Sequence, residues 1–546
     1  MTTMKYIADH INNDKIYNQK RKYKVVMVPR KLHVCEMILE NEGVYGDIDI
    51  LELNLDLIPL DRDLLSLEMP DFFRTFYLDS DYVWIHTVAK SLIGLQAFTG
   101  MIPNIYCIGK GAKMVYDLMD TILGEKMVEP EYSRNEIGSL FIIDRNVDFV
   151  TPLCSQLTYE GLLDETFGIS SGFIEFGKEV SGKDQTTKLL LTSQDEIFEE
   201  VRNRHVSNVF GYLSTKAKSL QTDFDKRHGF TSVGDMKNFV ANELRNLKQQ
   251  KSVLAQHIGA CEVILNRKTK GDFEEYLQTE HSLLEGSGMR ENLNYIEELI
   301  YKQHSLIQTL KLICLMSLTQ DGIPSRDYKS LKTQYLQSHG FEHMLTFYNL
   351  KRLGILKGQE SQLPQQQGGT PLNKVTSGVA SITSRSSYKN LCKRLNLIPK
   401  SDEINLKSPT DMSYVFSGAY SPISCKLIDQ VLNKEGFLGM DDITKHLPGP
   451  TFSKVRLKQS RAKGSSQSFK TADPPCLKVV LVYFLGGCTF SEISALRIQI
   501  LGSNYCNDKW KHIPRISDGE TAKLKFSKIT LPLEKKISRL SKNVLH

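Results

Sequence analysis

The sequence has neither a long hydrophobic run nor a cysteine arrangement typical of a zinc or redox site. Its most apolar stretch, Leu477 to Leu485, is far shorter than the ~20 residues that a membrane-spanning helix needs. The first residues, MTTMKYIADHINND, contain no apolar segment of the signal-peptide kind. The ten cysteines include no CxxC pair and no Cys/His cluster at zinc-ligand spacing. We therefore expect buried thiols in a reducing cytosol, no bound metal, and only peripheral contact with membranes.

The best match to a nucleotide-binding motif fails at the position that would hold magnesium. Residues 177–184, GKEVSGKD, fit GxxxxGK but place Asp184 where a phosphate loop needs a Ser or Thr hydroxyl. A carboxylate at that position would repel the phosphates. We therefore interpret the segment as a surface loop and predict that Lys183 binds no phosphate. The HExxH motif of zinc proteases is also missing from the sequence.

Charged residues follow the apolar strand pattern SLFIID. Enzymes with α/β folds often place carboxylates at such strand ends. A phosphatase-type DxD would need an aspartate at 146, however, and Asn146 cannot act as an acid or base. We predict instead that Arg145 forms a network with Asp144 and Asp148, and that Pro152 stiffens the segment. No catalytic residue and no cofactor are predicted.

The positive charge is confined to the end of the chain. The net charge is +6, and residues 498–546 hold ten Lys/Arg against four Asp/Glu, while the preceding 497 residues hold 59 of each. The body is therefore electrically balanced, and only the tail could attract nucleic acid or anionic lipid. We expect this tail to be unfolded and dispensable. With 546 residues, 40% of them hydrophobic, the chain can form several globular domains.

Hydrophobic periodicity divides the chain into α/β and helical regions. Strand and helix patterns alternate in residues 22–144, which predicts parallel α/β sheets. Apolar residues then repeat at heptad spacing in 206–224 and 240–265, which predicts two long helices folded back as a hairpin around a turn at 228–235. The alternative is an ordinary core seam, because packing inside a bundle needs the same pattern.

Residues 305–356 look like a small helical module of winged-helix type. Its third helix carries basic charge only at Lys351 and Arg352, which is poor for binding phosphates, so we favour a scaffold module over a nucleic-acid binder. The polar segments 358–387 and 456–475 are predicted to be exposed, mobile insertions. Strand and helix patterns return in 405–497, so we expect the α/β sheet to resume there.

Two segments resemble signatures of the SM (Sec-one/Munc-eighteen-like) family, a DRxxDxxTPL sequence followed by a helix with a tyrosine, and a terminal GGxTxSE element. The matching residues are Asp144, Arg145, Asp148, Thr151, Pro152, Leu153 and Tyr159 in the first, and Gly486, Gly487, Thr489, Ser491 and Glu492 in the second. Intervening segments such as SLKTQYLQSHG and KRLNLIPK resemble the vacuolar protein-sorting thirty-three branch, with the B paralogue closest. The similarity runs from about Met4 to Arg497.

The resemblance implies a three-domain arch of α/β plus all-α type, with parallel α/β sheets and a large helical domain inserted into the second α/β domain. The divisions that we expect are domain 1 at 1–66, domain 2 at 67–170 and 405–497, domain 3 at 171–404 with a hairpin within 195–300, and a divergent tail at 498–546. The family's first strand and helices and its final strand and helix are not matched. We therefore expect an incomplete or alternatively spliced product.

The resemblance also implies a non-enzymatic regulator of SNARE-mediated vesicle fusion and endosome/lysosome trafficking. Its partners would be SNARE proteins, a helical class C tethering partner of the subunit-sixteen type, and small Rab-type GTPases. It would be cytoplasmic, at the surface of late endosomes, lysosomes or recycling endosomes. We predict the class C contact at Tyr414 and Tyr420, for which the alternative is that both are core tyrosines. The competing functions are a winged-helix nucleic-acid-binding protein and a nucleotide-binding enzyme.

Overall fold

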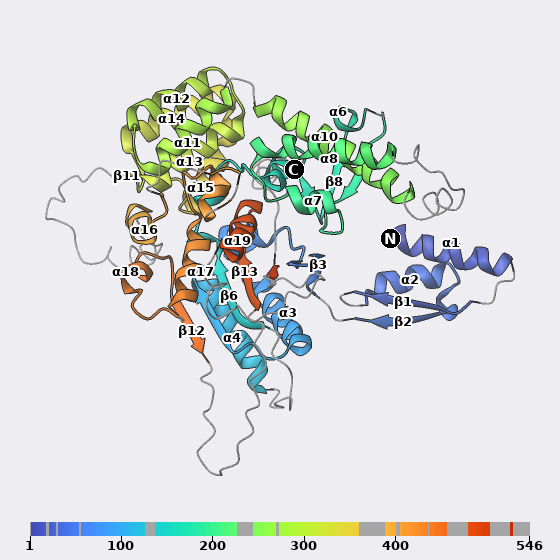
Figure 1. Ribbon diagram of the computed structural model, residues 1–546. Helices are drawn as coiled ribbons and strands as arrows, with labels where there is room; N and C mark the ends of the chain where they lie inside the picture. The colour runs from blue at the N-terminus through green and yellow to red at the C-terminus, as the bar shows by residue number, and fades with distance from the viewer. Residues whose placement is uncertain are drawn as a thin grey trace, which may run out of the picture.

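The chain forms a small N-terminal unit and a larger body of sheet and helices (Figure 1). The computed structural model describes residues 2–17, 21–28, 31–53, 56–125, 137–182, 184–225, 244–268, 272–359, 388–399, 405–407, 409, 411–434, 436–455, 479–502 and 525–527. None of the helices in these ranges is long and apolar enough to cross a membrane.

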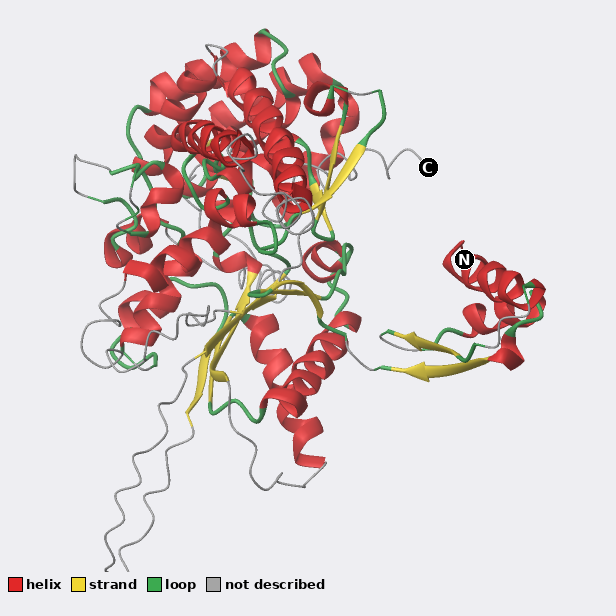
Figure 2. Ribbon diagram, turned by 45° about the vertical axis from the view of Figure 1, so that its right-hand side comes forward, coloured by secondary structure: helices red, strands yellow, loops and turns green. Residues whose placement is uncertain are grey.

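The N-terminal unit is a two-stranded parallel sheet with helices packed against it. Its elements are α1 (Thr2–Ile16), β1 (Tyr23–Met27), α2 (His33–Asn41), η1 (Tyr45–Asp47) and β2 (Ile48–Glu52). Its small core is formed by Ala8, Ile11, Leu39, Val44 and Ile48. Figures 1 and 2 show the unit to one side of the body.

A seven-stranded sheet lies at the centre of the body, in the order β12-β5-β6-β13-β14-β4-β3. Its strands are β3 (Ile58–Asp61), β4 (Leu64–Ser66), β5 (Asn104–Ile108), β6 (Ile137–Asp144), β12 (Thr451–Val455), β13 (Val479–Leu485) and β14 (Lys525–Ser527). The five inner strands are parallel, and the two edge strands pair antiparallel. Strands β5, β6 and β13 are apolar on both faces, as expected for parallel strands that are buried on both sides.

Helices cover both faces of this sheet. Alternate strand residues such as Cys107, Ile142 and Tyr483 pack into a core with the segment η2, α3 and α4, while Ile108 and Phe484 pack on the other face with α5, α17 and α19. The bounds are η2 (Arg74–Leu78), α3 (Val83–Thr99), α4 (Lys110–Glu125), η3 (Arg145–Val147), η4 (Thr151–Leu153), α5 (Tyr159–Thr166), η10 (Met412–Phe416), α17 (Ile423–Asn433), α18 (Asp441–Thr444) and α19 (Phe490–Gly502).

The chain between α5 and η10 is mostly helical and includes a small antiparallel sheet, β7-β8-β9. This region contains β7 (Ile169–Ser170), β8 (Phe173–Phe176), α6 (Lys178–Ser181), β9 (Thr187–Leu190), α7 (Glu196–Val201), α8 (Val206–Asp225), α10 (Leu244–Lys268), α11 (Asp272–Glu285), α12 (Met289–Tyr301), α13 (Leu306–Thr319), β10 (Ile323–Pro324), α14 (Ser325–His339), η7 (Phe341–His343), α15 (Met344–Arg352), β11 (Gly358–Gln359) and α16 (Tyr388–Leu395). The chain then returns to the central sheet, first through the edge strand β12 and then through β13. The predicted mixture of α/β and all-α structure is therefore confirmed, whereas the domain limits stay predictions.

Several expectations fall outside the described residues, and one is wrong. The turn at 228–235, the loop 456–475 and nearly all of 358–387 are not described, although 358–359 form β11. The tail was expected to be unfolded, and residues 503–524 and 528–546 lie outside the described residues, but residues 498–502 continue α19 and residues 525–527 form β14, between β13 and β4. The backbone hydrogen bonds of a parallel sheet account for this difference, and composition alone does not reveal them.

Candidate functional site

The two signature segments meet at one edge of the central sheet. Strands β6 and β13 are parallel neighbours, and their last residues, Asp144 and Leu485, are register partners. The residues that follow each strand therefore emerge side by side at the carboxyl edge, where open α/β sheets usually bind ligands.

A buried ion pair joins these segments. The Arg145 guanidinium is only 4% exposed, and its two terminal nitrogens donate to the two carboxylate oxygens of Glu492 at 2.8 and 2.9 Å. The same guanidinium donates to the backbone oxygens of Gly487 and Asp148. Burial alone would raise the pKa of Glu492, but Arg145 holds it below its usual value. The sequence predicted a network of Arg145 with Asp144 and Asp148. In the structure Asp148 lies 4.0 Å from the guanidinium, Glu492 is the main partner, and Asp144 pairs instead with the first turn of α4.

Glu492 also completes a capping box at the start of α19. Its carboxylate accepts from the backbone N–H and the hydroxyl of Thr489, while the Thr489 hydroxyl accepts from the Glu492 backbone N–H. The Ser424 hydroxyl donates to the remaining side of the carboxylate at 2.6 Å. One buried carboxylate thus binds the ends of β6, α17 and α19 together.

Asp148 and Asp144 each accept from the beginning of another helix. Asp148 accepts from the backbone N–H of Thr151 and of Ser424, near the start of α17. Asp144 accepts from the backbone N–H groups of Gly111 and Ala112, at 2.8 and 2.7 Å, in the first turn of α4. Its carboxylate therefore takes the place at a helix N-terminus where phosphate binds in nucleotide-binding folds.

Close packing around Asp144 leaves no room for a phosphate there. A Cβ added at Gly109 would overlap the Asp144 carboxyl group, and Gly111 faces the Leu485 side chain. Burial raises the pKa of Asp144 to about 7, although the two backbone N–H groups oppose this shift. The arrangement is structural, and in the described part of the chain no group of three or more His, Cys, Asp or Glu side chains could hold a metal ion.

The other signature residues shape this edge. Gly486 and Gly487 have φ values of +105° and +98°, which favour glycine, and a Cβ at Gly486 would lie 2.7 Å from the Tyr77 ring. Ser491 donates through its backbone N–H to Gln156 at 3.1 Å. Pro152 lies near the start of the 3-10 turn η4, where its fixed φ is readily accommodated.

Tyr159 ties α5 to the long helix α10. Its buried hydroxyl lies 3.0 Å from Nδ1 of His257, whose Nε2 lies 2.9 Å from the Asp195 carboxylate. Tyr159 begins α5, His257 lies in α10 and Asp195 caps α7, so these hydrogen bonds fix α10 against the body. The sequence identified Tyr159 only through its signature, because its partner lies 98 residues away.

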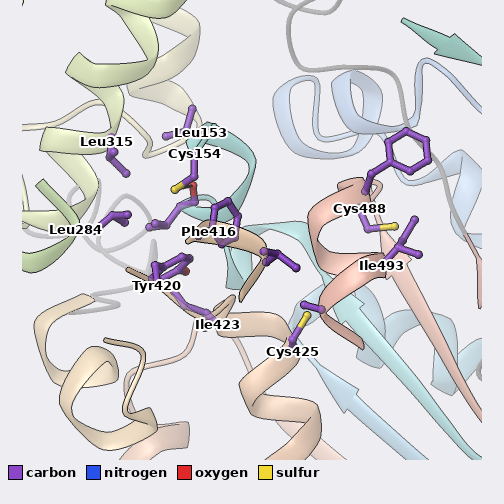
Figure 3. Packing of buried hydrophobic residues seen from close by; sticks show 14 of the residues in the cluster. Leu153, Cys154, Leu284, Leu315, Phe416, Tyr420, Ile423, Cys425, Cys488 and Ile493 are labelled. Atoms are coloured by element: carbon purple, nitrogen blue, oxygen red, sulfur yellow. Dashed lines mark hydrogen bonds between the residues drawn. The ribbon is translucent and has the colours of Figure 1, made fainter. Parts of the chain in front are cut away.

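The two tyrosines predicted to bind the class C partner are buried. The Tyr420 hydroxyl lies 3.2 Å from the Thr151 hydroxyl, and the Tyr414 hydroxyl accepts from the His205 backbone N–H. Figure 3 shows Tyr420 beside Phe416 and Ile423 in the packed interior. Neither side chain can meet a partner in this structure, so the alternative of core tyrosines accounts better for both.

A second buried charge network was missed from the sequence. Arg497 donates to Asp63 at 2.7 and 2.9 Å and to Glu160 at 3.0 Å, and the nearly buried Arg202 pairs with Asp61 at 2.5 Å. Burial alone would raise the pKa of Asp61, but Ser193 and Arg202 lower it to about 2. The network joins the β3–β4 turn to α5, α7 and α19. Its members are far apart in sequence, so no local pattern reveals them.

Two motif-like segments have no catalytic geometry. In 177–184, residues 178–181 form the short helix α6, Asp184 pairs with Lys178 at the surface, and Lys183 lies outside the described residues. Residues 168–172, GISSG, match the GxSxG pattern of hydrolases. Ile169 and Ser170 form strand β7, however, and Ser171 and Gly172 form the turn to β8, so the segment is a hairpin and not the strand-to-helix elbow that a nucleophile needs.

The heptad residues of the predicted hairpin face inward. Helices α8 and α10 pack on each other, and Leu213, Leu220, Leu254 and Cys261 are buried. The alternative of a core seam therefore describes these four residues. Phe210 differs, because its side chain is 43% exposed.

The winged-helix-like module exposes an apolar face. Phe341, Met344, Leu345 and Tyr348 are all exposed, at the spacing of one helix face, along η7 and α15. An apolar surface is poorly suited to a phosphate backbone and better suited to a protein partner.

Comparisons with known proteins agree with this geometry. The Sec1 family profile matches residues 1–505. Human vacuolar protein sorting-associated protein 33B is 48% identical over 504 residues, which cover 90% of this chain and 80% of the human protein. Rat vacuolar protein sorting-associated protein 33A is 35% identical over 507 residues, covering 90% of this chain and 79% of the rat protein.

Solved structures show the same fold at low identity. The SM protein Vps45, in complex with the Qa SNARE Tlg2, aligns with a TM-score of 0.61 at 15% identity, over 99% of this chain and 85% of that one. The Unc18–syntaxin 1 complex from Monosiga brevicollis gives 0.59 at 15% identity, over 94% of this chain and 82% of its match. The chain therefore belongs to the Sec1 family of non-enzymatic trafficking regulators, in the vacuolar protein sorting 33 branch, and its identity to the human B protein is greater than its identity to the rat A protein.

Proposed function

We propose that this chain regulates SNARE-driven vesicle fusion by holding SNARE helices on the outer surface of the α8–α10 hairpin. The observation that carries the proposal is the hairpin itself, two long helices of 20 and 25 residues packed together with the aromatic Phe210 left exposed on α8. Vps45 and Unc18, which share the fold, were solved in complex with SNARE proteins.

Physical chemistry explains how binding alone could promote fusion. A SNARE helix is disordered until it zippers with its partners, so its assembly requires a large loss of conformational entropy. A rigid pair of helices that binds one SNARE in helical form removes part of that cost before the partners meet. Such a role needs no hydrolysis of a nucleotide. This is consistent with the Asp144 carboxylate, which occupies the helix N-terminus where nucleotide-binding folds hold phosphate.

We also propose that a helical class C tethering partner binds the exposed face formed by Phe341, Met344, Leu345 and Tyr348. Their spacing suits an amphipathic helix laid along α15, and aromatic residues are enriched among interface hot spots. This site replaces Tyr414 and Tyr420. Recruitment by that partner to late endosomes, lysosomes or recycling endosomes, and contact with Rab-type GTPases, remain predictions from the family resemblance.

The test is capture from cell extract with the full chain, followed by mass spectrometry. We expect SNARE proteins and a helical tethering subunit in the captured material. Tyr348→Asp should remove the tethering subunit and retain the SNAREs, because it places a charge on the apolar face. Phe98→Asp is the matched control, since Phe98 is similarly exposed but lies on α3. Capture of neither partner class by the unmodified chain would refute the proposed function.

A further inference from the structure

The α8–α10 hairpin is seated on the body through a glycine. Gly259 lies within α10, and a Cβ at this position would be 2.7 Å from the backbone oxygen of Val180 and 3.3 Å from its Cγ1. Glycine is unfavourable inside a helix, so its presence calls for a packing reason. The close approach of turn α6 supplies that reason, because any larger residue would have to move a backbone atom.

Turn α6 belongs to the segment 177–184, whose sequence partly matches a phosphate loop. It follows strand β8, packs on α10, and ends at Gly182 with φ of +64°. The Ser181 hydroxyl donates to the backbone oxygen of Gly177 at 3.0 Å, which closes the turn. The segment therefore presents a fixed backbone carbonyl to α10 instead of a phosphate site.

Other contacts fix α10 on both sides of Gly259. On one side, His257 contacts Tyr159 and Asp195 as described above. On the other, Arg267 donates to the backbone oxygen of Thr166 at 3.2 Å and lies 3.6 Å from the Glu179 carboxylate, just before Val180. The part of α10 from 257 to 268 is therefore docked on the body, and α8 packs on this helix.

We propose that Gly259 is a positioning residue: by allowing α10 to rest on the Val180 carbonyl, it sets the orientation in which the α8–α10 surface is presented to a bound helix. The inference rests on the proposed function in one respect, that the bound helix is a SNARE. The contact between Gly259 and the Val180 carbonyl is a property of this chain, and its effect on the orientation of the hairpin can be measured without a partner.

The matched control is Gly211, the glycine inside α8. A Cβ at Gly211 would have no atom within 4 Å, so Gly211→Ala makes the same chemical change on the same hairpin without a clash. Spin labels at Lys248 on α10 and Lys188 on β9 would report the orientation of the hairpin relative to the body. Both variants and the unmodified chain are compared as the full chain.

We expect Gly259→Ala to shift or broaden the distance between the labels and to weaken capture of SNAREs by about fivefold or more, the lower end of typical coupling between sites. Gly211→Ala should leave both readings as in the unmodified chain. An unchanged distance and unchanged capture in Gly259→Ala would overturn the proposal.

Val180→Gly alone keeps the test decisive if Gly259→Ala fails to fold. This variant should broaden the distribution of distances between the two labels, because it weakens the packing of turn α6 on α10. A distribution as narrow as that of the unmodified chain would overturn the proposal. Failure of the proposed function gives a different result. In that case the unmodified chain captures no SNARE, and the presentation role falls with it even if the label distances shift.

Discussion

Removal of the Arg145 side chain should destabilise the chain strongly, through Glu492. In Arg145→Ala the Glu492 carboxylate stays buried and loses both guanidinium hydrogen bonds. Loss of one partner of a buried ion pair typically costs 3–5 kcal/mol. We expect about 3 kcal/mol, the lower end, because Ser424 and Thr489 continue to donate to the carboxylate.

The dependence of this effect on pH distinguishes the mechanism. Without Arg145, burial should raise the pKa of Glu492, so the unpaired charge destabilises the folded state most at high pH and is relieved by protonation as the pH falls. Urea unfolding of Arg145→Ala should therefore differ from that of the unmodified chain more at pH 8 than at pH 5. The double variant Arg145→Ala/Glu492→Ala should cost less than the sum of the single changes.

Two outcomes would refute this reasoning. One is additivity of the single and double variants, which would mean that the two side chains do not act as a pair. The other is an Arg145→Ala chain with an unchanged unfolding midpoint that no longer captures SNAREs, which would make the residue part of a binding site. Lys178→Ala is the control, because it removes an exposed ion pair with Asp184 and should leave the midpoint unchanged.

Three further predictions concern other parts of the chain. Asp61→Asn should cost about 1–2 kcal/mol at pH 6, and in urea unfolding this difference should shrink gradually as the pH falls from about 4 towards 2, because the folded pKa of about 2 lies under the ordinary value; a difference as large at about pH 2 as at pH 6 would contradict it. Lys183→Ala and Asp184→Ala should leave SNARE capture and the unfolding midpoint unchanged, whereas loss of capture in a folded variant would restore a role for this loop. Truncation after Gly502 should lower the unfolding midpoint, because it removes β14 from between β13 and β4; an unchanged midpoint would show the tail to be dispensable after all.

Local patterns predicted the elements well, and pairings across the chain poorly. The heptad spacing predicted the two long helices, but it could not distinguish a seam between them from a surface for a partner. The Thr489–Glu492 spacing is that of a capping box, and the structure contains one. Glu492 pairs with Arg145, 347 residues away, because β6 and β13 are neighbours in the central sheet. The order of strands in a sheet cannot be predicted from local patterns in one sequence.

The tyrosines illustrate the same limit. Aromatic residues fill cores and interfaces alike, so the segment around Tyr414 and Tyr420 could not be assigned to either from composition. Contacts with His205 and Thr151, more than 200 residues away in sequence, decide in favour of the core. Conversely, the sequence did not predict the exposed apolar face of α15. The winged-helix pattern was judged only by its basic charge, and apolar residues at helical spacing occur in cores as well as on surfaces.

The most direct test of the central claim is site-specific photo-crosslinking from the hairpin. A photo-reactive amino acid at Phe210, exposed on α8, is compared with the same residue at Phe98, which is 67% exposed on α3. In cell extract, we predict crosslinks to SNARE proteins from position 210 and none from position 98. Crosslinks to SNAREs from position 98 only, or from neither position in a chain that captures SNAREs, would contradict the claim that the hairpin holds them.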